Sequence, residues 1–405
     1  MLYVPGNKGI FVKTRSGLDR ISASFPEKLR GSTIGLLCHA ASVRSDLVHA
    51  IDVFDEQPSC SLAAVFGPQH GLHGQTQDNM VEWEGARHAV LNIPVYSLYG
   101  AKRKPTRTML EPLDALVIDL QDVGARPYTY LWTVKLCLEA CAETGTSVWI
   151  LDRPNPIAAI DIDGPMISTE FFSFVGGAHL PLCHRMTLGE IGRMLQQEYF
   201  PGVDLTVVEM QDWYRNSLWD ETGLPWVLPS PNMPTLDTAL VYPGQVLLEA
   251  TTLSEGRGTT RPFELFGAPY LDREKFELCF KSWNLPACRL RAHDFQPTFQ
   301  KWAGGYCVGW QVHVTNAREY RPVLTTFALL DSARRAGGDH FAFNNPPYEY
   351  EYGKMPFDIL AGDSTWRELL LDGCTRVSLV EMWRHSYQEF KKYCGNCARY
   401  KEESA

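Results

Sequence analysis

The sequence predicts an α/β protein with a Rossmann-like parallel sheet domain and a second, smaller α/β (α+β) domain. Two observations point to this class. Short, nearly continuous apolar runs recur through the first half of the chain, as in strands buried on both faces of a parallel sheet. Helix-compatible segments separate them, which indicates a doubly wound arrangement. A length of 405 residues favours two domains, and we expect a boundary after residue 162, giving domains 1–162 and 163–405.

The expected strands of the first domain are short and apolar. They cover residues 33–38, 62–66, 95–98, 115–119 and 147–151. Helices are expected at 46–55 and at 130–143. In the second of these, Leu131, Val134, Leu138, Cys141 and Ala142 fall on one helical face.

The pattern changes after about residue 163. A helix is expected after Thr187, which forms a capping-box pattern with Glu190. Residues 205–208 resemble a strand, and the alternating run 307–314 resembles a half-buried one. Two further helices, 322–336 and 377–393, are expected to close the domain.

Composition excludes several kinds of partner. The net charge of −9 argues against a nucleic-acid ligand. No apolar run approaches the roughly 20 residues that span a bilayer, so no membrane partner is expected. The segment Met1 to Gly17 has no signal-peptide pattern, and the eleven scattered cysteines suit a reducing compartment. We therefore expect a cytoplasmic protein, and the single CxxC pair, Cys394 and Cys397, is a weak zinc signal.

Polar loops follow three of the expected strands. They cover residues 67–74, 120–130 and 152–156 and are rich in Gly, Pro, amide, imidazole and carboxylate groups. Ligands of parallel sheets bind beyond the carboxyl ends of the strands, so these loops should converge on one rim. Neither GxGxxG nor GxxxxGK[ST] is present. We therefore expect no cofactor and a small-molecule substrate.

The loops contain three groups of candidate site residues. In the first, Gln69, His70, His73 and Asp78 allow either a metal site or contacts of His70 with a sugar or carboxylate. In the second, carboxylate, amide and guanidinium groups stand beside two tyrosines that could stack on a sugar ring; these are Asp119, Gln121, Asp122, Arg126, Tyr128 and Tyr130. In the third, Asp152, Arg153 and Asn155 form either an internal ion pair or a binding group. Asn232 lies in the proline-rich loop 226–235.

Residues 246–269 carry five charges of both signs within a Gly- and Thr-rich stretch: Glu249, Glu255, Arg257, Arg261 and Glu264. They indicate either a solvated loop or a ligand site. Arginine forks match a carboxylate in two-point contacts, and glycoside hydrolysis normally needs two carboxyl groups. No GxSxG and no recognisable cysteine nucleophile are present, so triad chemistry is not expected.

Six motifs in order along the chain resemble the NamZ-like exo-β-N-acetylmuramidases, formerly a domain of unknown function. The resemblance runs from about residue 32 to the C-terminal region. The motifs begin at Gly67 (Gly-Pro-Gln-His-Gly), Ser97 (Ser-Leu-Tyr-Gly), Asp119 (Asp-Leu-Gln-Asp-Val-Gly-Ala-Arg-Pro-Tyr-Thr-Tyr), Leu151 (Leu-Asp-Arg-Pro-Asn-Pro), Ser230 (Ser-Pro-Asn-Met-Pro-Thr) and Ser254 (Ser-Glu-Gly-Arg-Gly-Thr-Thr-Arg-Pro-Phe-Glu).

The resemblance implies release of terminal N-acetylmuramic acid from the non-reducing end of peptidoglycan fragments, in a cleft between the two domains. The lactyl carboxylate of that sugar would explain Arg257 and Arg261. Where the family's motif usually reads Pro-Glu-His-Gly, this chain has Gln69. An amide cannot donate a proton as a carboxylic acid does.

Two interpretations of Gln69 follow. In the first, another carboxylate, Asp122, Glu249 or Glu255, carries the chemistry. In the second, the protein is a non-catalytic or weakly active binder of muropeptides. A metal-dependent hydrolase using His70 and His73 is a third alternative. Soluble, recycled wall fragments are the expected substrates.

Overall fold

The computed structural model describes residues 14–77 and 81–403. The segment Met1 to Gly17, from which we expected no signal peptide, lies largely outside this range. Asp78, a candidate ligand of the alternative metal site, also lies outside it. Within the described residues, no helix is both long enough and apolar enough to cross a membrane.

A seven-stranded sheet forms the first domain, with the order β3-β4-β2-β1-β5-β6-β9. All its neighbouring strands are parallel except the β3–β4 pair. The strands are β1 (Thr33–Cys38), β2 (Ser61–Gly67), β3 (Ala86–Arg87), β4 (Pro94–Ser97), β5 (Ala115–Asp119), β6 (Ser147–Leu151) and β9 (Leu205–Val208). The predicted strands 33–38, 115–119, 147–151 and 205–208 are confirmed to the residue.

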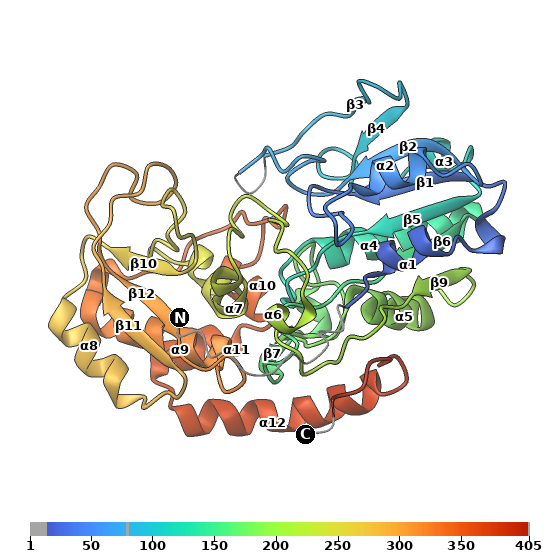
Figure 1. Cartoon of the computed structure of the whole chain (residues 1–405). Coiled ribbons are helices and arrows are strands. Elements are labelled where there is room, and N and C mark those ends of the chain that lie inside the picture. Colours follow the sequence, from blue (N-terminus) through green and yellow to red (C-terminus); the bar gives the residue numbers. More distant parts are fainter. Residues whose placement is uncertain (1–13, 78–80, 404–405) are drawn as a thin grey trace, which may run out of the picture.

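Helices cover both faces of this sheet (Figure 1). Alternate residues of each strand enter different cores: Leu36 and Val117 pack on one face, and Leu37 and Ile118 on the other. The first face carries α1 (Gly17–Ala23) and α2 (Ala50–Asp55), and the second carries α3 (Arg107–Leu110), α4 (Tyr130–Thr144) and α5 (Leu188–Tyr199). The predicted doubly wound sheet is therefore confirmed, and so is the capping box of Thr187 with Glu190.

The second domain is built around the antiparallel sheet β10-β12-β11. Its strands are β10 (Leu265–Ala268), β11 (Cys288–Ala292) and β12 (Val308–Val314). Trp310 of β12 stacks on Phe276 of α8, with ring centroids 4.0 Å apart. The helices are α7 (Leu236–Gln245), α8 (Arg273–Ser282), α9 (Pro322–Gly337), α10 (Pro356–Ala361), α11 (Thr365–Asp372) and α12 (Arg376–Cys394).

Several short elements join these layers. They are β7 (Asp163–Met166), β8 (Pro181–Cys183), α6 (Trp219–Thr222) and the 3-10 helices η1 (Glu27–Leu29), η2 (Thr169–Phe171), η3 (Val246–Ala250) and η4 (Gly338–His340). Of these, η3 contacts α7 and α10 and opens the charged stretch 246–269.

The last helix, α12, starts beside α9 and runs along the lower edge of the view toward α5 (Figure 1). The residues that follow α12 form hydrogen bonds with the first domain. The predicted boundary after residue 162 would place β9 in the second domain, although β9 pairs with β6. We propose that the first domain extends to the start of α7.

Candidate active site

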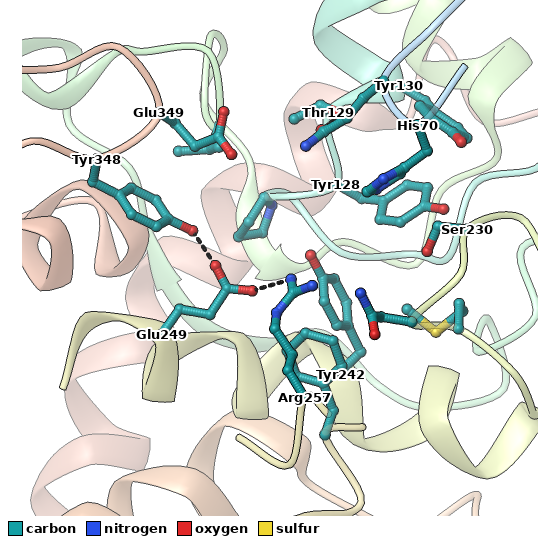
Figure 2. A pocket seen from close by; sticks show the side chains of 16 residues that line it. His70, Tyr128, Thr129, Tyr130, Ser230, Tyr242, Glu249, Arg257, Tyr348 and Glu349 are labelled. Carbon is teal, nitrogen blue, oxygen red and sulfur yellow. Dashed lines mark hydrogen bonds and ion pairs between the residues drawn. The ribbon is translucent and has the colours of Figure 1, made fainter. Parts of the chain in front are cut away.

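A pocket of about 460 Å³, counting the space open to solvent at its mouth, lies between the two domains. Seven of the residues expected at the site line it: Gln69, His70, Tyr128, Tyr130, Asn232, Glu249 and Arg257. The loops after β2 and β5 therefore meet the stretch 246–269 here. Figure 2 shows Glu249, Tyr348 and Glu349 on one side and His70, Tyr128 and Ser230 on the other.

Glu249 is fixed at both carboxylate oxygens. It lies on η3, where its Oε1 accepts a hydrogen bond from Arg257 Nη2 at 2.7 Å and its Oε2 accepts one from the Tyr348 phenol at 2.7 Å (Figure 2). The side chain of Asn344 also donates to the Glu249 carbonyl at 2.9 Å. Glu249 is therefore a carboxylate held in one orientation at the pocket wall.

Glu255 is buried behind that wall. It lies 3.5 Å from Arg257 Nε and 2.7 Å from Lys301 Nζ. Burial alone would raise the pKa of this carboxyl, but Lys301 and Arg257 hold it below its ordinary value. Burial opposes the charge of Arg257, whereas Glu249 and Glu255 raise the pKa of its guanidinium. Arg257 thus acts as a buried cation between two acids.

Two glycines make this packing sterically possible. Gly256 and Gly258 both have positive φ, 76° and 79°. A Cβ on Gly256 would lie 2.5 Å from the carbonyl oxygen of Leu265, and one on Gly258 would lie 2.7 Å from Phe299. Of the two interpretations of residues 246–269, the solvated loop is wrong, because among the five charged side chains only Arg261 is exposed.

Gln69 and His70 form the part of the pocket wall contributed by the first sheet. The Gln69 amide oxygen accepts from the Thr129 hydroxyl, and its nitrogen donates to the Tyr99 phenol at 3.1 Å. The His70 Nδ1 lies 2.7 Å from the Thr76 carbonyl. Burial lowers the pKa of His70 to about 4, so its imidazole is neutral near pH 7.

Aromatic rings line the pocket beside His70 (Figure 2). Tyr128 meets Tyr130 and Tyr242 edge to face, at centroid distances of 4.7 and 5.9 Å. The Tyr130 phenol donates to the carbonyl of Pro229 at 2.7 Å, in the proline-rich loop that carries Asn232. A flat apolar surface edged with hydroxyl and amide groups suits a sugar ring.

Glu349 is a pocket residue that was not predicted from the sequence. It lines the pocket and is only 4% exposed, and its Oε2 accepts a hydrogen bond from the Tyr99 phenol at 3.0 Å. Burial, followed by the nearby charge of Glu249, raises the pKa of Glu349 to about 7. Two prolines followed by alternating Tyr and Glu, residues 346–352, could have indicated a site loop in the sequence, as the prolines did for loop 226–235.

The backbone at Glu349 is strained. Glu349 and Tyr350 have φ of 43° and 67°, and His70 and Phe263, also at the pocket, have 71° and 62°. Non-glycine residues rarely adopt such angles, at a cost of about 1–3 kcal/mol each, and they concentrate at functional sites. The clustering of three of them on the pocket wall is independent support for this location.

Asp122 lies away from the pocket lining. It is buried, and its Oδ2 accepts from the Gly124 amide at 2.7 Å and lies 3.6 Å from His184 Nε2. Burial raises the pKa of Asp122 to about 7 and lowers that of His184 to about 3. Burial therefore favours the uncharged forms of both side chains over an ion pair.

Three other expected binding residues hold loops together. Arg126 is fully buried and donates to the carbonyls of Pro165, Leu180 and Leu360. Gln121 donates to the carbonyls of Asp122 and Pro154. Arg153 makes a two-point contact with Asp119, at 2.5 and 2.7 Å. None of the three lines the pocket between the domains, although Gln121 and Arg153 line a separate hollow near Trp219.

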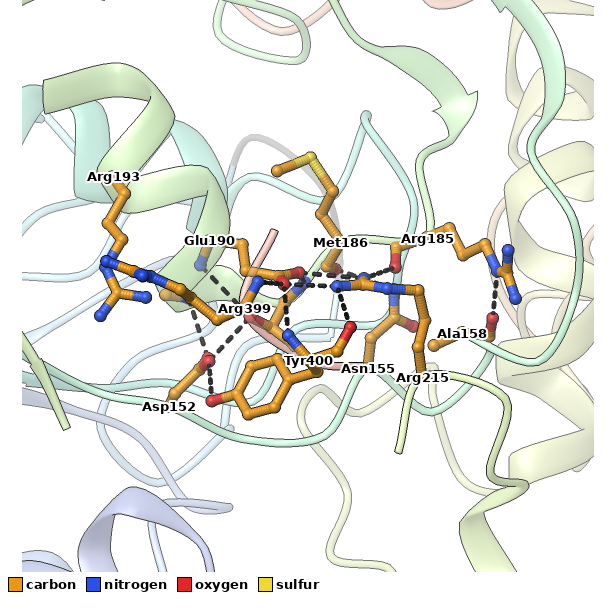
Figure 3. Close-up of polar contacts among 12 residues, drawn as sticks. Asp152, Asn155, Ala158, Arg185, Met186, Glu190, Arg193, Arg215, Arg399 and Tyr400 are labelled. Atoms are coloured by element: carbon orange, nitrogen blue, oxygen red, sulfur yellow. Dashed lines mark hydrogen bonds and ion pairs between the residues drawn. The ribbon is translucent and has the colours of Figure 1, made fainter. Parts of the chain in front are cut away.

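Asp152 and Asn155 belong to a polar cluster that joins the C-terminal segment to the first domain (Figure 3). Asp152 accepts from the hydroxyls of Thr187 and Tyr400, both at 2.7 Å. Asn155 donates to the carbonyl of Met186 at 2.9 Å. The loop after β6 therefore supports the fold and does not reach the pocket wall.

Arg261 also lies outside the pocket lining, 3.4 Å from Glu264, with its side chain 44% exposed. The alternative metal site does not assemble in the part of the chain described here: His73 is exposed, and no three His, Cys, Asp or Glu side chains gather as a metal site in that part. All eleven cysteines, including Cys394 and Cys397, are free thiols.

The chemistry available at the pocket is that of two carboxyl groups held differently. Glu249 is paired with a buried cation, Arg257, at 2.7 Å. Glu349 is buried near Glu249, which favours the protonated form. Two carboxyl groups that face one pocket provide the pair that glycoside hydrolysis normally uses.

Known proteins are similar to this chain over both of its domains. Two family models match, "Exo-beta-N-acetylmuramidase NamZ, N-terminal" over residues 34–237 and "Exo-beta-N-acetylmuramidase NamZ, C-terminal" over residues 240–400. The "Peptidoglycan beta-N-acetylmuramidase NamZ" of Bacillus subtilis (strain 168) is 38% identical over 382 residues, which are 94% of this chain and 90% of that protein.

Two solved structures are similar as well. Both are crystal structures of DUF1343 family proteins from Bacteroides fragilis NCTC 9343. One has a TM-score of 0.85 at 29% identity and the other 0.74 at 25% identity. In each case 96% of this chain and all of the other chain are covered. The junction between the two family models, at 237–240, coincides with the start of α7.

Proposed function

Because this chain belongs to the exo-β-N-acetylmuramidase NamZ family, we propose that it hydrolyses the glycosidic bond of terminal N-acetylmuramic acid in peptidoglycan fragments. The sugar would be released from the non-reducing end, as the resemblance of its motifs implies.

One observation carries the proposal. Glu249, buried and fixed by Arg257 and Tyr348, faces the same cavity as a second carboxyl, Glu349. Glycosidases use two such groups with their pKa values set apart by the surroundings. We assign the role of the cation-paired carboxyl to Glu249. Glu255 then serves to keep Arg257 in place, and Asp122 contributes to the fold rather than to the reaction.

The lining of the pocket supplies contacts for a terminal sugar. Tyr128 and Tyr242 would contact the ring faces, while Asn232 and His70 would contact its substituents. Arg257 is already paired with two carboxylates, so it would meet the lactyl carboxylate only as part of that network.

The eleven free thiols favour a reducing compartment. We propose the cytoplasm as the location and soluble fragments from wall recycling as the substrates.

The test is release of free N-acetylmuramic acid from a disaccharide that carries this sugar at its non-reducing end. Glu249→Gln should reduce the rate at least about 10²-fold, while Glu274→Gln, an exposed glutamate on α8, should match the wild type. Tight binding of the disaccharide by calorimetry without turnover would instead support the alternative favoured by Gln69, a muropeptide-binding protein. Equal rates for wild type and Glu249→Gln would refute the assignment of Glu249.

A further inference from the structure

The position that carries Gln69 is connected to Glu349 by a single side chain. The Gln69 amide nitrogen donates to the Tyr99 phenol oxygen at 3.1 Å, and the Tyr99 hydroxyl donates to Glu349 Oε2 at 3.0 Å. All three side chains are buried. A carboxyl group is therefore present one hydrogen-bonded side chain away from the amide at position 69.

The polarity of this chain is set by the amide. Thr129 donates to the Gln69 oxygen, so the Gln69 nitrogen faces Tyr99 and leaves the Tyr99 hydroxyl hydrogen for Glu349. A glutamate at position 69 would offer Tyr99 only acceptor oxygens and compete for that hydrogen. Because Oε2 of Glu349 is already an acceptor, a proton on this carboxyl belongs on Oε1.

The hairpin that carries Glu349 is built to hold it in the pocket. Tyr348 and Glu351 exchange two backbone hydrogen bonds of 2.9 Å, with positive φ at both residues between them. Such turns normally use Asn or Gly. On the outer side, the Tyr350 ring lies 4.0 Å beneath the Arg103 guanidinium, and its phenol donates to Glu82 at 3.3 Å. These contacts fix the hairpin against the first domain.

From this arrangement we propose that Glu349 is the proton donor of the reaction, in place of the acid that position 69 lacks, and that Gln69 and Tyr99 are positioning residues for it. This inference rests on the proposed function.

The step balances with water as co-reactant. The proton on Glu349 passes to the glycosidic oxygen as the bond from that oxygen to the anomeric carbon breaks, and the bonding electron pair stays on the oxygen. Water supplies the new oxygen at the anomeric carbon, and one of its protons returns the site to its starting state. One glycosidic bond and one water are consumed, and each product gains a hydroxyl group.

The experiment compares two substrates with different leaving groups. A sugar alkoxide needs protonation to depart, whereas 4-nitrophenolate leaves without it. We expect Glu349→Gln to lower kcat/KM on the disaccharide by about 10²–10⁴-fold and to have a much smaller effect on 4-nitrophenyl N-acetylmuramide. The matched control is Glu351→Gln, which removes the same charge two residues along; Glu351 accepts from the Gly353 amide and is not part of the pocket lining.

The pH profile gives a second readout, which loss of structure would not produce. The groups that act on Glu349 are Glu249, Tyr99, Arg257 and Arg103. The Tyr99 hydrogen bond lowers the pKa of Glu349, so Tyr99→Phe should move the basic limb of kcat/KM to higher pH. Glu349→Gln should abolish that limb, and adding Gln69→Glu to it should restore part of the disaccharide activity.

Each contrary outcome is distinct. If Glu349→Gln lowers kcat/KM by the same factor on both substrates, the role of Glu349 is overturned and the proposed function still stands. A wild type that cleaves only the nitrophenyl substrate and gains disaccharide cleavage through Gln69→Glu would overturn both the role of Glu349 and the proposed activity on wall fragments. A wild type that cleaves neither substrate would overturn the function and this assignment together.

Discussion

The phenol of Tyr348 donates to Glu249 Oε2 at 2.7 Å, on the side of the carboxylate opposite Arg257. The two donors come from distant parts of the chain, the hairpin after η4 and the glycine-rich stretch before β10. Together they fix the plane of the Glu249 carboxylate. This order is a property of the folded second domain, because neither segment alone could provide it.

Tyr348→Phe should weaken catalysis without unfolding the protein. It removes one hydrogen bond to a charged group, worth about 1.5–3 kcal/mol, so kcat/KM should fall about 10–100-fold. The control is Tyr352→Phe, at an exposed position of the same segment. Steady-state kinetics at matched thermal stability would show the difference, and an unchanged kcat/KM would mean that Arg257 alone orients Glu249.

Arg257→Gln should destabilise the protein strongly. The substitution leaves the buried Glu249 without its cation and Glu255 with Lys301 alone. Removing one partner of a buried pair costs about 3–5 kcal/mol. The double variant Glu249→Gln/Arg257→Gln should recover part of this loss in urea unfolding. A double variant as unstable as Arg257→Gln would show that Glu249 contributes little to the penalty.

Asp122→Asn should change stability in a pH-dependent way. Burial raises the pKa of Asp122 from 3.8 to about 7, so the folded state keeps its proton where the unfolded state has lost it. The contribution of this carboxyl to stability therefore falls as pH rises from about 4 to 7. The asparagine variant escapes that loss. Relative to the wild type it should gain about 1–3 kcal/mol between pH 5 and pH 8, at about 1.4 kcal/mol per pKa unit.

Thermal unfolding at pH 5 and pH 8 measures this gain, and turnover by Asp122→Asn should stay close to the wild-type value. A loss of more than about 10²-fold in turnover with an intact fold would show that Asp122 takes part in the reaction. A gain independent of pH would show that Asp122 does not hold its proton.

Tyr400→Phe should loosen the C-terminal segment. The phenol of Tyr400 donates to Asp152 and accepts from the Met210 amide at 2.9 Å. Burial raises the pKa of Asp152 to about 6, against the effect of the Tyr400 hydrogen bond, which lowers it. The hydrogen bond from Tyr400 favours the ionised form of Asp152. Its removal should lower the free energy of unfolding by about 1–3 kcal/mol, and by more at pH 8 than at pH 5. Differential scanning calorimetry at the two pH values tests this, and an equal loss at both would contradict it.

The strands of the first domain could be read from the sequence because each is a compact apolar run between turn residues. Residues 115–119 show this plainly: all five are buried, so their identity alone specifies the strand. The position of β9 was recognised, but its partner was not, since pairing with β6 depends on how α5 crosses the sheet. This long-range relationship shifted the expected boundary.

The site was predicted in part for a similar reason. Glu249 and Arg257 stood out because charges in a glycine-rich stretch are unusual. Asp122, Asp152 and Arg153 looked equally suitable, since their positions after strands do not distinguish contact with a ligand from contact with a neighbouring loop. Glu349 lay in a hairpin whose strained turn is invisible without backbone angles. Its importance arises from the fold bringing it beside Tyr99.

The anchoring of the C-terminal segment limits how this enzyme opens. Arg399 and Tyr400 follow a helix of the second domain but bind Glu190 and Asp152 of the first. Rotation of the domains about a hinge would break these contacts as well as those of the hairpin. A sugar is therefore expected to enter through the solvent-facing mouth of the pocket while the two domains stay in place.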